Sequence, residues 1–256
     1  MRGGSIDYDR HAGAYPAKRR ADPRIAARVL AALGDARSVL NVGAGCGSYE
    51  PRDRYVLAVE PSAAMRAQRP AGLAPAIDAC AEALPLDADS FDVAMAMATI
   101  HHWRDPGAGL RELRRVARER VVVLTFDPDA LGDFWLLADY LPEALADDRR
   151  RFPSIGEVAE ALGAAGVESI PIPAGCSDGF LEAYYARPEA FLDPSVRAAQ
   201  SIWPRLPAGV EGRALSALRA DLRSGAWDQR RGQMRSLPSY EGALRLVVSR
   251  PAAGLS

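Results

Sequence analysis

Five short apolar segments alternate with helical signals over residues 38–126, and this alternation restricts the fold more than any other feature. The segments are Ser38–Val42, residues 55–60, residues 75–80, Phe91–Met97 and residues 120–126. Asp-Pro pairs at residues 22–23 and 105–106 predict helix starts, because Asp accepts at the N-cap and Pro fits the first turn. Strands that alternate with helices predict right-handed crossovers and a doubly wound, mostly parallel α/β sheet.

The second half of the chain is less regular. Ser154 and Glu157 form a capping-box pattern before a short helix. Residues 167–173 predict a sixth strand, which Pro171 and Pro173 confine to a sheet edge because proline cannot donate to the ladder. Residues 179–227 are mostly helical in pattern, and Leu244–Ser249 predicts a closing strand, the seventh.

Charge and cysteine content exclude several classes of protein. Lysine plus arginine number 32 against 33 acidic residues, a net charge of −1, so a nucleic-acid or membrane-surface partner is not expected. The chain has three cysteines and no CxxC spacing. This predicts a protein of the reducing cytoplasm without a metal site. We find no signal-peptide core and no apolar stretch of about 20 residues for a membrane span. Lys18 is the only lysine among the basic residues, which suggests a GC-rich bacterial coding bias.

A glycine-rich loop follows the first predicted strand directly. Gly43, Gly45 and Gly47 remove side chains where backbone amides can approach a ligand, and Glu60 ends the second strand, where a carboxylate can accept both ribose hydroxyls. A dinucleotide fingerprint would place its third glycine at Ser48, and the short segment after it contains Pro51. A phosphate-free adenosine ligand therefore fits better, and a nucleotide-dependent oxidoreductase is the disfavoured alternative.

Three segments together carry a resemblance to a known family: VLNVGAGCGSYE, VLAVEPSAAM and AEALPLDADSFDVAMAMATIHHW. In this order they resemble the class I S-adenosylmethionine (SAM)-dependent methyltransferases, and most closely the type 11, ubiquinone-biosynthesis-like branch that acts on small molecules. The resemblance covers about residues 8–126. It implies a Rossmann-like methyltransferase fold with a seven-stranded sheet, and SAM as the cofactor with S-adenosylhomocysteine as its product.

The resemblance also implies which residues hold SAM. The glycine loop would line the methionine and ribose portions, Glu60 would bind the ribose hydroxyls, and Arg19 or Arg20 would close over the SAM carboxylate. The implied cofactor-binding residues are Arg19, Arg20, Gly43, Ala44, Gly45, Gly47, Glu60, Pro61, Met65, Ala81, Glu82, Met97 and Ala98. Two positions depart from the family: Asn41 replaces an acid before the first glycine, and Cys80 replaces an Asp near the adenine.

Candidates for the acceptor side follow the fourth strand and occupy the arm. His101 and His102 are adjacent, so we expect only one to face the pocket and favour His102 as general base, with His11 in reserve. The alternative is that the pair merely orders the turn before the next helix. Aromatic residues after position 126 suggest an apolar or aromatic acceptor. Candidate substrate-binding residues are Tyr8, Tyr15, His101 and Trp135.

The sequence thus predicts a single domain over residues 1–256 that transfers a methyl group from SAM to an O, N or C atom of a small organic molecule. Residues 1–21 would be an arm, 22–126 the SAM-binding half, 127–243 the substrate half with a helical cap insertion, and 244–250 the closing strand. A SAM-binding protein without methyl transfer, cyclase-like or regulatory, is the alternative.

Overall fold

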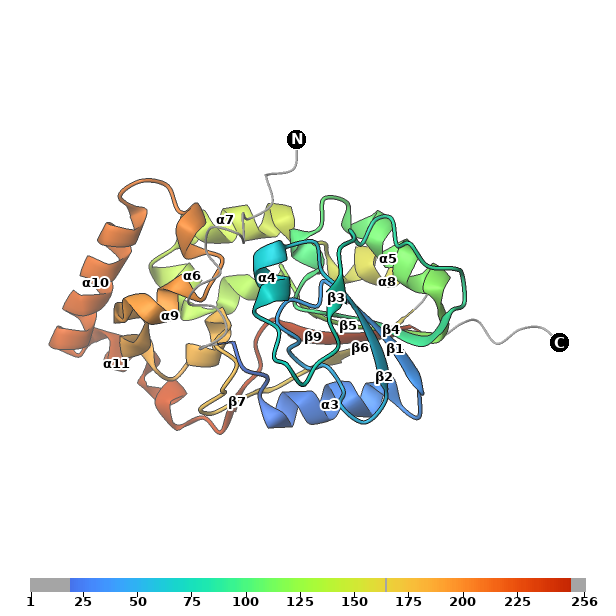
Figure 1. The fold of residues 1–256 in the computed structure, drawn as a ribbon. Helices are drawn as coiled ribbons and strands as arrows, with labels where there is room; N and C mark the ends of the chain where they lie inside the picture. Colours follow the sequence, from blue (N-terminus) through green and yellow to red (C-terminus); the bar gives the residue numbers. More distant parts are fainter. Residues whose placement is uncertain (1–18, 164, 250–256) are drawn as a thin grey trace.

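A computed structural model describes residues 19–163 and 165–249, and its centre is a seven-stranded sheet (Figure 1). The strand order is β3-β2-β1-β4-β5-β9-β6. β1 to β5 are parallel, whereas β9 runs antiparallel to both β5 and β6. The strands are β1 (Ser38–Val42), β2 (Tyr55–Val59), β3 (Ala76–Ile77), β4 (Phe91–Met97), β5 (Ala117–Phe126), β6 (Ala165–Ser169) and β9 (Leu244–Ser249).

Helices cover both faces of this sheet (Figure 1). α3 (Pro23–Leu33) shares one buried cluster with Val93 and Met95 of β4, while α5 (Pro106–Val116) and α8 (Ile155–Ala161) contribute to the other cluster with Ala94 and Ala96. This division follows from the pleat of β4, which points successive side chains to opposite faces. The doubly wound architecture predicted from the alternating pattern is therefore confirmed.

Local sequence signals set the helix starts. The side chains of Asp22 and Asp105 accept from backbone N–H groups at the start of α3 and α5, and Ser154 and Glu157 form the predicted capping box before α8. The helix after β2 is short: α4 spans only Ala63–Ala67, with Ser62 at its N-cap.

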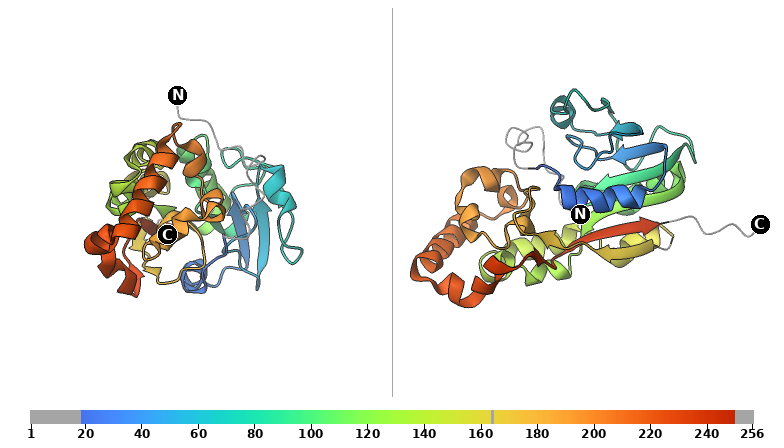
Figure 2. Two further views of the ribbon diagram at one scale, coloured as in Figure 1. Left: turned by 90° about the vertical axis from the view of Figure 1, so that its left-hand side faces the viewer. Right: turned by 90° about the horizontal axis from the view of Figure 1, so that it is seen from below.

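A mainly helical segment lies at one end of the sheet, between β7 (Ile172–Pro173) and β8 (Ser239–Tyr240), as Figures 1 and 2 show. It contains η4 (Leu181–Tyr184), η5 (Pro188–Leu192), α9 (Pro194–Ala198), η6 (Trp203–Arg205), α10 (Val210–Ser224), α11 (Ala226–Arg231) and η7 (Gly232–Ser236). Further helical elements follow β4 and β5 and lead toward it: η2 (Ile100–His102), η3 (Ala130–Asp133), α6 (Trp135–Asp139) and α7 (Pro142–Arg151). No helix in the described ranges is long and apolar enough to cross a membrane.

The predicted sixth strand divides into two. β6 pairs with β9 at the edge of the main sheet and ends at Ser169, whereas β7 pairs with β8 in a separate two-stranded sheet. Pro171 lies between the two parts and has no N–H to continue the ladder. The edge position predicted for this segment is correct, but its continuity to residue 173 is wrong.

Candidate functional site

The glycine loop between β1 and β2 adopts a backbone that side chains disfavour. Gly43, Gly45 and Gly47 have φ values of 66°, 50° and 90°. A Cβ atom on Gly43 would lie 2.2 Å from Thr99 Oγ1, just beyond β4. Glycine at position 43 is therefore required both by the left-handed backbone and by the closeness of Thr99.

The carboxylate of Glu60 joins this loop to the end of β2. Gly45 N–H donates to its Oε2 and Ser62 N–H donates to its Oε1, each at 2.9 Å. The residue is 8% exposed, and burial raises the pKa of the carboxyl above its ordinary value. Glu60 is thus oriented by two backbone amides at the position where the family resemblance places the ribose-binding acid.

A buried ion pair beneath the loop, between Arg69 and Glu50, was not predicted from the sequence. Arg69 Nη2 lies 2.9 Å from both carboxylate oxygens of Glu50, with the two side chains only 3% and 1% exposed. Arg69 also donates to Gly45 O, and Asn41 Nδ2 donates to Glu50 Oε2 at 3.0 Å. Asn41, which replaces the usual acid, thus has a partner in Glu50. The sequence signal available was an acid within the unusually short segment after Gly47.

The other residues implied for SAM lie around the same edge of the sheet. Met65 is buried, with its Cε 3.2 Å from the position of a Cβ on Gly45, whereas Pro61 is exposed. Met97 ends β4, and Ala98 follows with a positive φ of 51°. Ala44, whose N–H donates to Val59 O, and Ala81 are both buried.

The Glu82 side chain forms hydrogen bonds with the backbone before α5. Its Oε1 accepts from the N–H groups of Arg104 and Asp105 at 2.7 and 3.1 Å. The side chain therefore connects the loop after β3 to the start of α5.

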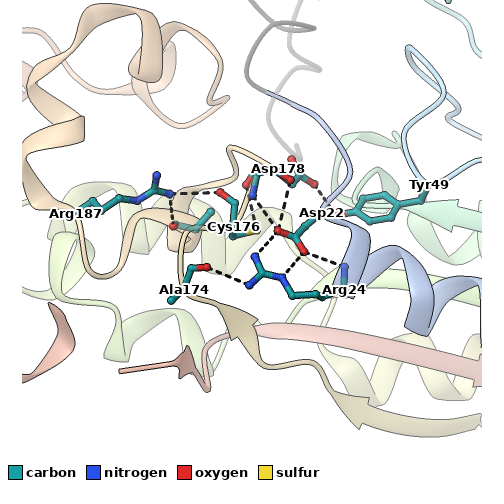
Figure 3. A network of polar contacts seen from close by, with 9 residues as sticks. Asp22, Arg24, Tyr49, Ala174, Cys176, Asp178 and Arg187 are labelled. Carbon is teal, nitrogen blue, oxygen red and sulfur yellow. Dashed lines mark hydrogen bonds and ion pairs between the residues drawn. The ribbon is translucent and has the colours of Figure 1, made fainter. Parts of the chain in front are cut away.

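Polar contacts join three distant segments beside the loop, and Figure 3 shows Asp22, Tyr49 and Asp178 in this network. Arg19 contacts the same network through Asp178. Asp178 is buried: its Oδ1 lies 2.6 Å from Arg19 Nε, and its Oδ2 accepts from the hydroxyl of Tyr49 at 2.8 Å. Nearby, Asp22 accepts from Arg24 and from Ser177 N–H, and Arg24 lowers the pKa of the Asp22 carboxyl. Asp178 thereby joins Arg19 of the arm to the loop after β7 and to Tyr49, which lies two positions after Gly47.

A cavity of about 460 Å³ opens between this arm and the glycine loop. Arg19, Arg20 and Gly47 contribute to its lining, while Glu60 and Met65 do not. It therefore borders the loop without coinciding with the whole site that the resemblance implies.

A smaller pocket, of about 70 Å³, lies beyond β4 and β5. Its lining is contributed by residues from both halves of the chain: Arg19, Ala98, His101, His102, Phe126, Leu131, Asp148, Phe152, Phe180, Leu181, Glu182, Gln200, Ser201 and Ile202. The volume has room for a few water molecules or one small organic group.

Both histidines line this pocket, so the expectation that only one would face it is wrong. His101 stacks on Phe152 with centroids 4.1 Å apart, and the His102 ring lies 3.9 Å from His101. The two rings remain adjacent because both belong to the single turn of η2. Burial lowers the pKa of both imidazoles well below the ordinary value, and the nearby Arg151 and Arg205 lower it further. The Nδ1 atom of His101 is buried without a hydrogen-bond partner among the described residues.

Two carboxylates that the sequence did not single out also line the pocket. Asp148 of α7 lies 2.6 Å from Arg205 Nη2, and burial raises the pKa of its carboxyl to about 6. Both oxygens of Glu182 accept from Ala243 N–H at 3.0 Å, and burial raises its pKa to about 7. Long-range packing alone brings these acids to the pocket.

Trp135 is not at the pocket but in the core, which corrects its prediction as a substrate contact. It is 0% exposed, its Nε1–H donates to Tyr185 O, and it packs edge-on against Trp227 at 5.3 Å. Buried apolar area thus explains this aromatic residue without a ligand. Tyr8, His11 and Tyr15 lie outside the described residues.

The fold and this loop define a class I, Rossmann-like methyltransferase domain. Residues 40–125 match the family model described as "Methyltransferase domain", type 11. The chain therefore contains a class I SAM-dependent methyltransferase domain of type 11. One curated relative, the uncharacterized protein YafE of Escherichia coli, is 35% identical over 60 residues, which are 22% of this chain and 29% of that protein.

Solved structures extend the similarity beyond the matched domain. A putative methyltransferase from an antibiotic biosynthesis pathway of Anabaena variabilis is 29% identical, with a TM-score of 0.83 over 91% of this chain and 99% of that one. The [4+2]-cyclase SpnF has a TM-score of 0.52 at 15% identity, covering 90% and 82% of the two chains. At that identity the second likeness concerns the fold alone.

Proposed function

We propose that this protein transfers a methyl group from SAM to a small organic acceptor, with residues 22–126 holding SAM and residues 127–243 forming the acceptor side. The observation that carries the proposal is the oriented Glu60 carboxylate beside a glycine loop, at the same sheet edge as the pocket lined by His101 and His102. When bound, SAM supplies an electrophilic methyl group on its sulfonium. The protein's part is to place the acceptor in line with that group.

Two features of the loop support a SAM site here. Gly43 lies too close to Thr99 to carry a Cβ, and the backbone amides of Gly45 and Ser62 fix the Glu60 carboxylate. Gly43, Ala44, Gly45 and Gly47 would line the ligand, together with Met65 and Met97. The assignments of Pro61, Ala81, Glu82, Ala98, Arg19 and Arg20 follow the family resemblance.

The acceptor in this proposal is planar and largely apolar. Phe126, Phe152 and Phe180 wall the pocket, with Phe126 and Phe180 at 5.4 Å between centroids. His101 and His102 form one side, and His102 contacts the acceptor in this proposal. The reported origin of the Anabaena protein, an antibiotic pathway, supports an acceptor from specialised metabolism.

Cellular location follows from cysteine chemistry in the same proposal. Cys46, Cys80 and Cys176 are free thiols, a state that reducing conditions maintain. We therefore propose that the protein acts in the cytoplasm, without nucleic acid or membrane as partner.

One titration series tests this function. SAM, S-adenosylhomocysteine and NAD are titrated calorimetrically against wild-type protein and against Glu60→Gln. We expect binding of the first two by wild type and at least tenfold weaker binding by the variant, because a charged hydrogen-bond acceptor is lost. Preferential binding of NAD would refute the proposal.

A second candidate function is a SAM-binding protein that does not methylate. Two observations support this second function: the lowered pKa of both histidines makes them weak bases, and the fold is shared with a cyclase. Mass spectrometry separates the two: methyl transfer yields an acceptor heavier by one methyl group and an equal amount of S-adenosylhomocysteine. Product without that by-product would identify the second function.

A further inference from the structure

Asp148 presents an unused carboxylate oxygen at the pocket. The residue is 5% exposed and lines the cavity with His101 and His102. Its ion-pair contacts with Arg205, at 2.6 Å, and with Arg151, at 3.8 Å, both fall on Oδ1. Within the described ranges, Oδ2 accepts no hydrogen bond, and it is not one of the fully buried atoms that lack a partner. This oxygen is therefore accessible and can accept a hydrogen bond from a molecule in the pocket.

His102 is not suited to accept a proton at its Nδ1 atom. Arg151 Nη2 lies 3.5 Å from this nitrogen and also 3.5 Å from His101 O. An arginine can only donate, so Nδ1 presents its lone pair to Arg151 and Nε2 carries the ring proton. Protonating Nδ1 would place two cations side by side in a buried site. His102 therefore offers an N–H donor.

We infer that Asp148 is the proton acceptor of the pocket and that the methyl acceptor is a planar molecule with a hydroxyl group directed at Asp148 Oδ2, an inference that rests on the proposed methyl transfer. The walls of Phe126, Phe152 and Phe180 fit the planar part. Arg151 and Arg205 disfavour an ammonium group at the same place, because like charges at short range repel each other. A neutral hydroxyl meets no such penalty.

The charges around Asp148 are compatible with this role. The titratable and charged groups near it are Arg151 and Asp147 on α7, Arg205 on η6, His101 and His102 on η2, Glu182 on η4, and Arg19. Burial raises the pKa of Asp148 to about 6, with the two arginines acting in the opposite direction. At neutral pH the carboxylate is therefore ionised, yet basic enough to take up a proton. The Glu182 oxygens are already held by Ala243 N–H.

The reaction balances with Asp148 as the only base. When bound, SAM supplies the methyl carbon, to which the acceptor oxygen bonds through its own electron pair while the sulfur keeps the electrons of the broken S–C bond. The hydroxyl proton passes to Asp148 Oδ2, which becomes a neutral carboxylic acid and later releases the proton to water. Arg205 on Oδ1 positions the carboxylate for this transfer.

Binding of a hydroxyl probe tests the inference without methyl transfer. Protein saturated with S-adenosylhomocysteine is titrated with 2-naphthol, and separately with 2-methoxynaphthalene, at about pH 5 and about pH 7.5. We expect wild type to bind 2-naphthol about tenfold more tightly at the higher pH, because an ionised carboxylate accepts a stronger hydrogen bond. The methyl ether, which has no O–H, should show less than a twofold change.

Two matched variants locate the effect. In Asp148→Asn the pH dependence for 2-naphthol should fall below twofold, whereas Asp147→Asn, which also removes a carboxylate bound to Arg205, should keep it. Carbon NMR of carboxyl-labelled aspartate, with Asp148→Asn for assignment, should give Asp148 a pKa near 6 in wild type. Retained pH dependence in Asp148→Asn, absence of 2-naphthol binding at either pH, or a pKa of Asp148 below the ordinary range would each overturn the inference. Loss of S-adenosylhomocysteine binding in wild type would instead refute the proposed function.

Discussion

Replacing Gly43 by alanine tests the central geometric claim, that the loop is closed against β4. The residue has φ of 66°, and a Cβ would meet Thr99 Oγ1 at 2.2 Å and Thr99 Cγ2 at 2.8 Å. A left-handed backbone costs a non-glycine residue about 1–2 kcal/mol. Overpacking adds about 1–3 kcal/mol. We expect Gly43→Ala to lose about 2–5 kcal/mol of unfolding free energy and at least tenfold in SAM affinity.

Gly175→Ala is the matched control for backbone strain. Gly175 has φ of 64°, but a Cβ there has no atom within 4 Å, so only the strain of about 1–2 kcal/mol should appear. Urea unfolding gives both free energies, and calorimetric titration gives the SAM affinities. Adding Thr99→Ala to Gly43→Ala should restore part of the stability, since Thr99 Cβ would still lie at 2.9 Å. Equal destabilisation of the two glycine variants, with SAM affinity unchanged in both, would refute the reasoning.

Three further predictions concern buried charge and the aromatic core. Arg69→Met should lower the unfolding free energy by about 3–5 kcal/mol, because Glu50 would remain buried without its cation. Urea unfolding measures this loss, and Arg150→Met, at an exposed ion pair, is the control. Asp148 has a folded pKa of about 6 against an ordinary value of 3.8, so its contribution to stability should decrease by up to about 3 kcal/mol as pH rises from about 4 to about 6. Subtracting the unfolding free energies of Asp148→Asn from those of wild type at each pH isolates the contribution of Asp148. If this difference does not change with pH, the raised pKa is contradicted. Trp135→Ala should cost about 3–5 kcal/mol through lost core packing, whereas an effect on acceptor binding in a still-stable protein would return Trp135 to the pocket.

The pocket is where sequence-based reasoning was least complete. His101 and His102 were identifiable because they directly follow a predicted strand, at the edge where parallel α/β sheets bind ligands. Asp148 was not, because an acid beside three arginines on a helix is usually a solvated or locally neutralised group. Its burial depends on Arg205, which is 57 residues away. Trp135 shows the opposite error, since an aromatic residue suggests a ligand until its neighbours are known.

The order of strands and helices, the glycine loop and the position of Glu60 were determined by the sequence itself. Each depends on local periodicity, capping or φ preference, which neighbouring residues specify. The β1, β4 and β9 bounds agree with the predicted segments for that reason. Tertiary structure alone decided what surrounds these elements: the partner of Asn41, the division of the sixth strand between two sheets, and the buried charges at the pocket. Burial and long-range pairing set the energies of those groups, and neither is encoded within a short window of sequence.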